Sequence, residues 1–469
     1  MKYIFNRFFC SVLCAVFLFT TAITANAGFL YVLNQQNAAA NQIYCFRVTE
    51  SSGSLDLVPG FPISSGGNGL TGTQSELMTM DTVNKRLYVI NKGSNTVSAF
   101  TINIANGALT PMPFSPFTVV TNAVTIAVHP TGSPVVIGGN TGSPIAGTYF
   151  SDSYIITPTT ATRATGSPFA TGGVRPFSSA FSKDGDYFYT GGALSNSWAG
   201  FGADETSGVL AAVSGSPIAA GTTGVLGYAT DTQGRIFTAT RSDGGLRVYT
   251  TSAGTPTAVS GSPFATAMTA LTEGELSPNE QFYVVVDSSG SEVGAYQITG
   301  VGAATSLSLV SGLVGTNGST ANSMAFNQTG THFFVANSST RNISRFTFNS
   351  GTGAISLIGV QVADSAGSSG FLAGTAYLAA APPTAANVGV SGRVTTSEGR
   401  GISGVRVSIS DARGDVRTAL TNPFGYYRFD EVQTGATYLV NASAKGRRFG
   451  TQTVTVGDEL TNLDITELP

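Results

Sequence analysis

The stretch Leu77-Met-Thr-Met-Asp-Thr-Val-Asn-Lys-Arg-Leu-Tyr-Val-Ile-Asn, residues 77–91, contains a short apolar segment, a polar turn and a second apolar segment with a tyrosine. Two apolar, β-branched or aromatic runs separated by Asp and Asn are typical of a β-hairpin. The pattern returns throughout residues 28–380. Its other clear copies begin at Val124, Ser178, Leu226, Thr272 and Ser323.

The spacing of these copies predicts the architecture. The positions that align at the end of the first segment are Asp81, His129, Ser182, Asp231, Ser277 and Asn327, and they are 48, 53, 49, 46 and 50 residues apart. A repeat of this length is typical of a four-stranded blade of a β-propeller. A proline also recurs once per unit, at Pro62, Pro116, Pro168, Pro217 and Pro263. Proline suits an outer edge strand because its nitrogen has no hydrogen to donate to a sheet.

One repeat is divided between the two ends of this region. Phe29-Leu-Tyr-Val-Leu-Asn matches the second strand of the other units, but the mature chain has no first strand before it. Phe371 to Ala380 can supply the missing strand. We therefore predict a seven-bladed propeller whose ends pair with each other, because ring closure removes two free sheet edges.

The repeat also resembles known families. Leu87-Tyr-Val-Ile-Asn-Lys-Gly-Ser-Asn-Thr-Val-Ser-Ala-Phe resembles the Tyr-Val-Thr-Asn type of propeller repeat, and residues 28–380 resemble the lactonase-like seven-bladed propellers. Some members of this group open sugar lactones, whereas others are binding or surface-layer proteins. The resemblance therefore implies the fold and leaves the activity open.

A second domain follows the proline-containing linker at 381–387. Residues 388–469 alternate between short apolar strands and Gly, Asp or Asn turns. Val390-Ser-Gly-Arg-Val, Gly401-Ile-Ser-Gly-Val-Arg-Val and Thr421-Asn-Pro-Phe-Gly-Tyr-Tyr-Arg-Phe resemble the carboxypeptidase regulatory-like domain, which implies a transthyretin-like β-sandwich. This segment contains no His or Cys for a catalytic zinc. We expect an all-β protein in which the sandwich supports, spaces or docks the propeller and has no peptidase activity.

The first 27 residues are predicted to be an export signal. Lys2 and Arg7 precede an apolar run from Phe8 to Ile23, which is followed by Ala25-Asn26-Ala27. An uncleaved membrane anchor is the alternative, but the Ala-x-Ala ending favours cleavage and leaves no transmembrane anchor. The mature protein is expected in the periplasm, at the cell surface or outside the cell. It would retain only Cys45, which is predicted to be a buried structural thiol.

Composition excludes several classes of function. The formal charge is −3 and no run of Lys or Arg is present, so nucleic acid is not expected as a partner. The chain has two histidines. His129 is predicted to cap a turn and His332 to be a buried structural residue, which leaves no basis for a Ser-His-Asp triad or a multi-histidine metal site.

Carboxylates are the best candidates for chemistry. Glu275 occupies the first-strand position that is alanine in other repeats, at Ala127, Ala180, Ala229 and Ala325. Glu273 is two residues earlier, so both side chains should lie on one face of the strand, near the central channel. This pair could act as a general base, hold a divalent cation such as calcium, or bind sugar hydroxyls. It could also be a hydrated channel lining without a substrate.

Loop residues complete the predicted site. Glu76 and Arg175 precede first strands and are expected at the same mouth, where Arg175 could stabilise an oxyanion. Candidate ligand contacts in loops after second strands are Trp198, Arg241, Asp243, Asp287 and Arg341. Trp198 is predicted to be either a surface platform or a packing residue between blades. Two hypotheses follow: a binding or scaffold protein for a glycan, peptide or surface protein, and a lactonase-like hydrolase.

Overall fold

The computed structural model describes residues 27–70, 76–141, 148–192, 195–363, 370–380, 387–411, 415–433, 436–456 and 460–468. Residues 1–26 of the predicted export signal and 381–386 of the predicted linker lie outside these ranges. The described residues form two compact units, residues 27–380 and residues 387–468. We describe each unit separately.

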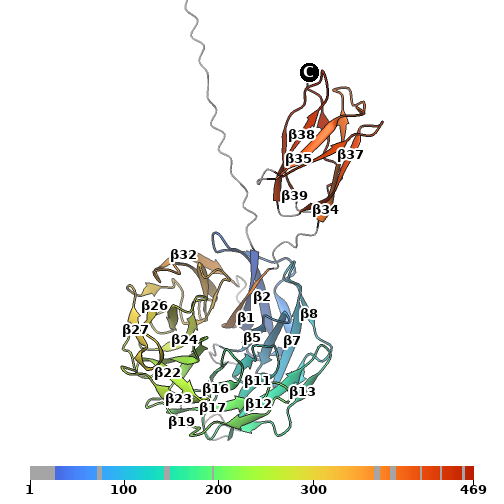
Figure 1. Cartoon of the computed structure of the whole chain (residues 1–469). Coiled ribbons are helices and arrows are strands. Elements are labelled where there is room, and N and C mark those ends of the chain that lie inside the picture. Colours follow the sequence, from blue (N-terminus) through green and yellow to red (C-terminus); the bar gives the residue numbers. More distant parts are fainter. Residues whose placement is uncertain are drawn as a thin grey trace, which may run out of the picture. The chain divides into compact units, whose positions relative to one another are not determined.

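The first unit is a propeller of seven antiparallel sheets arranged in a ring (Figure 1). Blade 1 contains β33 (Phe371–Ala379), β1 (Ala27–Gln35), β2 (Ala40–Thr49), β3 (Ser54–Leu57) and β4 (Ile63–Asn68). Blade 2 contains β5 (Met78–Asp81), β6 (Arg86–Asn91), β7 (Thr96–Ile102), β8 (Leu109–Pro111) and β9 (Phe117–Thr118). Blade 3 contains β10 (Thr125–Val128), β11 (Val135–Thr141), β12 (Thr148–Ile156), β13 (Ala161–Arg163) and β14 (Phe169–Ala170).

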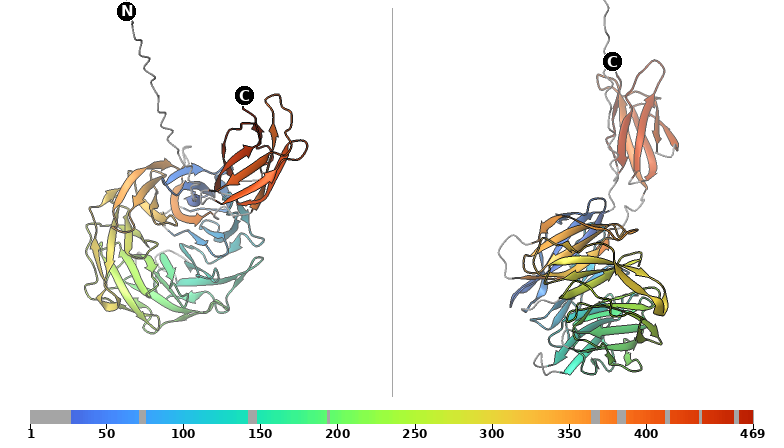
Figure 2. Two further views of the ribbon diagram at one scale, coloured as in Figure 1. Left: turned by 45° about the horizontal axis from the view of Figure 1, so that its top comes forward. Right: turned by 90° about the vertical axis from the view of Figure 1, so that its left-hand side faces the viewer.

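The remaining four blades follow in chain order around the ring (Figure 2). Blade 4 contains β15 (Ser178–Phe181), β16 (Tyr187–Gly191), β17 (Ser197–Ala203), β18 (Leu210–Ala212) and β19 (Ile218–Ala219). Blade 5 contains β20 (Val225–Thr230), β21 (Arg235–Thr240), β22 (Leu246–Ser252) and β23 (Thr255–Ala258). Blade 6 contains β24 (Leu271–Leu276), β25 (Phe282–Asp287), β26 (Glu292–Thr299), β27 (Ser306–Leu309) and β28 (Val314–Gly315). Blade 7 contains β29 (Ala321–Phe326), β30 (His332–Asn337), β31 (Asn342–Phe348) and β32 (Ile355–Val362).

The second strand of each blade explains the apolar runs of the repeat. Every residue of β6, β21, β25 and β30 is buried. A strand covered on both faces is apolar throughout, whereas a half-exposed strand alternates. The continuous sequence Arg86-Leu-Tyr-Val-Ile-Asn is therefore the signature of a strand packed between neighbouring blades.

The predicted ring closure is confirmed. β33 pairs antiparallel with β1, in a register that runs from Gly28 opposite Ala379 to Gln35 opposite Phe371. The last strand of the propeller thus serves as the innermost strand of the first blade. The prolines are also where we predicted them, because Pro62, Pro116, Pro168 and Pro217 directly precede the short edge strands β4, β9, β14 and β19.

The aligned position after each inner strand has a common structural task. Asp81 Oδ1 accepts hydrogen bonds from the backbone N–H groups of Val83 and Asn84, at 3.0 and 2.8 Å. His129 Nδ1 accepts one from the Thr131 N–H at 3.2 Å, so its predicted turn-capping role is confirmed. Different side chains at this position therefore have the same role, which is to accept hydrogen bonds from the backbone N–H groups of a tight turn.

Two further residues have the predicted structural roles. His332 is buried in β30. Cys45 is buried in β2, and burial raises the pKa of its thiol to about 12. Both groups pack into the propeller wall.

The second unit is a small sandwich. One sheet has the order β36 (Val416–Leu420), β35 (Arg406–Ser410), β38 (Ala436–Ser443) and β39 (Gln452–Val456). The other has the order β37 (Tyr426–Gln433), β34 (Asn387–Thr395) and β40 (Ile465–Thr466). Val390, Val407, Phe429 and Val440 form its core, together with other apolar residues of both sheets.

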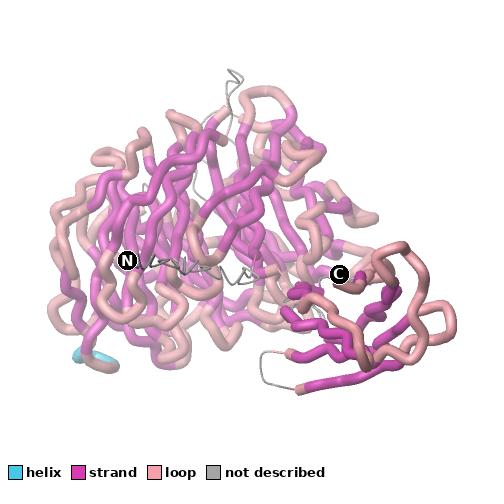
Figure 3. Tube along the Cα trace, turned by 90° about the horizontal axis from the view of Figure 1, so that it is seen from above, coloured by secondary structure: helices cyan, strands magenta, loops and turns pink. Residues whose placement is uncertain are grey.

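Helix is almost absent from the described residues. The helical segment drawn in Figure 3 is the three-residue 3-10 turn Gly302–Ala304. None of the helices in the described ranges has the length and apolar character needed to cross a membrane.

Candidate functional site

The inner strands of the propeller surround a cavity of about 630 Å³. Its wall includes Glu76, Ser179, Glu273 and Glu275, and it extends to the turns after the inner strands at His129, Lys183 and Pro278. Lys183 and Pro278 are exposed, so these turns form the rim of the cavity. We refer to this cavity as the central channel. Its size falls within the range of small-molecule sites, roughly 300 to 1,000 Å³.

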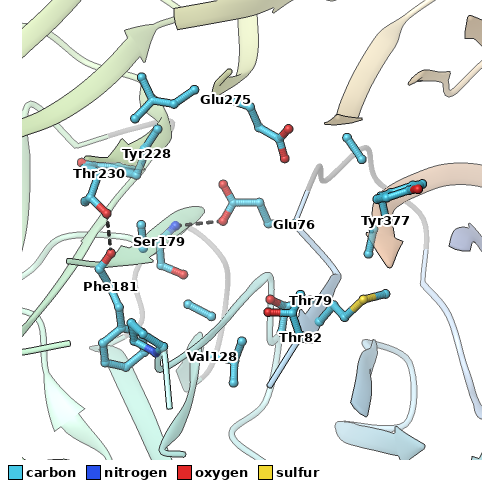
Figure 4. Close-up of a pocket in the computed structure, with 18 of the residues that line it drawn as sticks. Glu76, Thr79, Thr82, Val128, Ser179, Phe181, Tyr228, Thr230, Glu275 and Tyr377 are labelled. Carbon is cyan, nitrogen blue, oxygen red and sulfur yellow. Dashed lines mark hydrogen bonds between the residues drawn. The ribbon is translucent and has the colours of Figure 1, made fainter. Parts of the chain in front are cut away.

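Glu76 is held firmly by two neighbouring blades (Figure 4). Its Oε2 accepts hydrogen bonds from Thr125 Oγ1 at 2.7 Å and from the Ser179 N–H at 2.8 Å. Its Oε1 accepts a hydrogen bond from Ser178 Oγ. Burial raises the pKa of Glu76 to about 7, although these hydrogen bonds oppose the rise. The carboxyl group therefore has a fixed position between blades 2, 3 and 4.

Glu273 has a different environment from that of Glu76. Burial raises the pKa of Glu273 well above its ordinary value, and the charges of Glu76 and Glu275 raise it further. Its Oε2 is buried and has no hydrogen-bond partner among the described residues. Burial thus favours the protonated carboxyl group, which can both donate and accept a hydrogen bond.

Glu275 is the second carboxyl group of the channel whose pKa lies near neutral pH. Burial raises its pKa to about 7, and the backbone N–H of Phe326 and the charge of Lys183 act against the rise. Figure 4 shows the carboxyl groups of Glu275 and Glu76 directed into the same central space. A carboxyl group with a pKa near 7 can accept and return protons at neutral pH. Burial thus raises the pKa of both Glu273 and Glu275, which are two residues apart.

The structure brings together only part of the predicted site. Glu76, Glu273 and Glu275 line the central channel, but Arg175 does not; it lines a separate cavity with Lys92 and Asn140. Our prediction that Arg175 shares the mouth with the glutamates is wrong. Its guanidinium lies over the Phe177 ring, with 5.7 Å between Cζ and the ring centroid, three residues before the inner strand begins.

Trp198 is fully buried, so the predicted surface platform is wrong and the packing alternative holds. Its ring lies 5.6, 5.7 and 5.0 Å from those of Tyr189, Tyr228 and Tyr249, measured between centroids. These residues belong to blades 4 and 5. Trp198 is therefore part of the apolar contact between blades.

The other predicted rim residues do not form one surface site. Asp287 is 2% exposed and accepts backbone hydrogen bonds from Thr269 and Ser289, so it shapes a turn. Asp243 is exposed but forms an ion pair with Arg247 at 2.6 Å. Arg241 is exposed and Arg341 is half-buried in the turn between β30 and β31. Asp287 and Asp243 thus form their contacts within the protein itself.

Sequence reasoning missed three contributors to the channel. Ser178 and Thr125 hold Glu76, and Lys183 places a positive charge near Glu275. Ser and Thr are common throughout the chain, so neither stands out from the repeat. Lys183 was detectable in principle, because the other repeats carry an uncharged residue at this position: Thr82, Pro130, Thr232, Pro278 or Gln328. Among the described residues, no group of three His, Cys, Asp or Glu side chains is placed to hold a metal ion.

Comparison with known proteins supports both parts of the architecture. Residues 389–467 match the family described as Carboxypeptidase regulatory-like domain. The propeller is similar to a candidate 6-phosphogluconolactonase from Bacteroides fragilis, with a TM-score of 0.60, 13% identity and coverage of 76% of this chain and 99% of the other. It is equally similar to the periplasmic gluconolactonase PpgL of Pseudomonas aeruginosa, with a TM-score of 0.60, 14% identity and the same coverage.

At such low identity these two similarities establish the fold alone. No curated protein sequence matches this chain. The chain therefore combines a lactonase-like propeller fold with a carboxypeptidase regulatory-like domain over residues 389–467.

Proposed function

We propose that the propeller binds a small, uncharged, hydroxyl-rich ligand of the glycan class in its central channel, and that it does so outside the cytoplasm. The observation that carries this proposal is the buried Oε2 of Glu273, which has no hydrogen-bond partner among the described residues. A buried polar atom without a partner is unfavourable, and a ligand hydroxyl can supply the missing bond.

The charges around the channel support an uncharged ligand. Glu76, Glu273 and Glu275 face Lys183 and the neutral imidazole of His129, whose pKa is lowered by burial. The raised pKa values of the three carboxyl groups and the charge of Lys183 leave the channel with little net charge, so it does not attract phosphorylated or carboxylated ligands. The ligand proposed here therefore differs in charge from the phosphorylated lactone in the name of the Bacteroides protein.

The extracytoplasmic location rests on the predicted export signal and agrees with the name of the periplasmic relative. The sandwich is proposed to act as a spacer or docking module for the propeller. A peptide or surface protein is a less favoured partner, because Trp198 and Asp287 are buried and cannot contact it.

A second candidate function is hydrolysis of a sugar lactone, which the pKa of Glu275 near 7 favours. Glu275 would take a proton from water as the hydroxide oxygen bonds to the lactone carbonyl carbon. Collapse of the tetrahedral intermediate would break the ring C–O bond. The departing alkoxide would then take a proton from Glu275, and the product acid would ionise and release one proton to solution.

Two measurements separate these functions. Calorimetry with neutral monosaccharides measures binding, and pH-stat titration with glucono-1,5-lactone measures turnover. Turnover that Glu275→Gln abolishes, and the exposed control Glu205→Gln retains, would identify a hydrolase. Saturable sugar binding without turnover would identify a binding protein.

Variants of Glu273 directly test whether its buried Oε2 binds the ligand. Glu273→Gln keeps a donor and an acceptor, so we expect it to retain sugar binding. Glu273→Leu removes both and should weaken binding about tenfold. If neither binding nor turnover is found across the panel in folded protein, the channel proposal is wrong.

A further inference from the structure

A second cavity, of about 240 Å³, shares no lining residue with the central channel. Lys92 and Asn140 lie at or after the ends of second strands, and Arg175 precedes an inner strand. In an antiparallel blade these positions fall at the same face, opposite the turns that follow the inner strands. The cavity is therefore on the face opposite the rim of the central channel.

Two cations line this cavity without an acidic partner. Among the described residues, neither Lys92 nor Arg175 forms an ion pair or a side-chain hydrogen bond, and each is half-buried. Burial lowers the pKa of Lys92, and the nearby charge of Arg175 lowers it further. The two positive charges thus repel each other in a cavity that is partly shielded from water. The chain as a whole carries a formal charge of −3. An anion between them would remove this repulsion.

Asn140 completes the polar wall of the cavity. It is 4% exposed, and its Oδ1 has no hydrogen-bond partner among the described residues. Its backbone is fixed, because its N–H donates to the Thr121 carbonyl at 3.1 Å and its own carbonyl accepts from Thr121 Oγ1 at 2.6 Å. The amide is therefore a positioned group that can bond to a hydroxyl carried by the same ligand.

We propose that Lys92, Arg175 and Asn140 form a binding site for one oxyanion group, a phosphate or a carboxylate, on a small hydroxyl-bearing compound. Arginine presents a planar pair of donors that matches two oxygens of such a group, and lysine adds a compact point charge. The site therefore prefers an anionic ligand, unlike the central channel, because two positively charged side chains line this cavity.

Calorimetry of the full chain without its predicted export signal tests the site, with inorganic phosphate and acetate as probes at constant ionic strength. Tighter binding of phosphate would assign the site to phosphate compounds, and tighter binding of acetate to carboxylates. We expect Lys92→Gln and Arg175→Gln each to weaken the preferred anion about tenfold. Arg241→Gln removes one positive charge from an exposed residue outside the cavity and should change the affinity less than about twofold.

A second measurement needs no variant. Limited acylation of lysines, followed by mass spectrometry, should show that phosphate or acetate slows modification of Lys92 several-fold but leaves the exposed Lys183 unaffected. The proposal is overturned if neither anion binds or protects Lys92. It is also overturned if Arg241→Gln weakens binding as much as Arg175→Gln does, because binding would then reflect general surface charge.

Discussion

The hydroxyl of Tyr377 donates a hydrogen bond to Glu50 Oε1, across 327 residues of sequence. Glu50 follows β2 of blade 1, and Tyr377 lies in β33, the strand that closes the ring. The other oxygen of Glu50 accepts from Asn327 Nδ2 at 2.6 Å and from Thr329 Oγ1 at 3.1 Å, both in blade 7. One buried carboxylate therefore links the closing strand to the first and last blades.

Tyr377→Phe should destabilise the propeller by about 1.5 to 3 kcal/mol, because a buried carboxylate loses a donor. Urea unfolding measures the change. Tyr228→Phe is the matched control, since the Tyr228 hydroxyl is buried and has no hydrogen-bond partner among the described residues. Equal losses for the two variants would show that the Glu50 contact does not stabilise the closure.

The stability of the propeller should fall between pH 5 and pH 8. Glu76 and Glu275 have pKa values of about 7 in the folded protein, against an ordinary value of 4.5. The folded state therefore binds these protons more tightly than the unfolded state, and the stabilisation is present below pH 4.5 and lost as the pH rises through 7. Each group should contribute about 2 to 3 kcal/mol across this range. Thermal unfolding at several pH values measures the slope, which Glu275→Gln should flatten and Glu205→Gln should not.

Lys183→Gln should raise the pKa of Glu275, because the charge of Lys183 favours the ionised carboxylate. We expect a shift of a few tenths of a unit, since the lysine is exposed and screened by solvent. NMR titration of a labelled Glu275 side chain measures it. Lys85→Gln removes a positive charge from a turn residue outside the channel lining and serves as the control. A downward shift would contradict the arrangement described here.

The fluorescence of Trp198 should report blade packing and no ligand contact. It is the only tryptophan and is fully buried, so its emission should be blue-shifted and protected from acrylamide in the folded protein. Trp198→Ala should reduce stability by about 3 to 5 kcal/mol. If the folded protein is quenched as readily as free tryptophan, the buried position is wrong.

The ion pair of Asp231 and Arg235 should be needed for folding of blade 5. The two side chains meet at 2.6 Å and are 0% and 3% exposed. Asp231→Ala leaves a buried guanidinium without its partner, at a cost of about 3 to 5 kcal/mol. Asp243→Ala breaks a pair with the same spacing whose carboxylate is 38% exposed, so water can reach the site and the cost should be smaller, about 1 to 2 kcal/mol. If urea unfolding shows the same loss of stability for both variants, burial does not strengthen the Asp231–Arg235 ion pair.

Local patterns in the sequence determined the blades and their closure. The apolar second strands, the turn residue after each inner strand and the spacing of its copies are set by backbone hydrogen bonding within one hairpin. The missing partner of Phe29-Leu-Tyr-Val-Leu-Asn indicated closure by Phe371 to Ala380, because an unpaired inner edge is unfavourable. Glu273 and Glu275 also followed from the sequence, since side chains two residues apart on a strand share a face.

Only the tertiary structure decided where loop and interface side chains point. Arg175 and Glu76 precede equivalent strands, yet Glu76 enters the channel, held by Ser178 and Thr125, while Arg175 lies beside Lys92 in another cavity. Trp198 follows a turn, yet it is buried between blades 4 and 5. The direction of such side chains is set by packing and charge contacts between residues from different blades, and these contacts have no local sequence pattern.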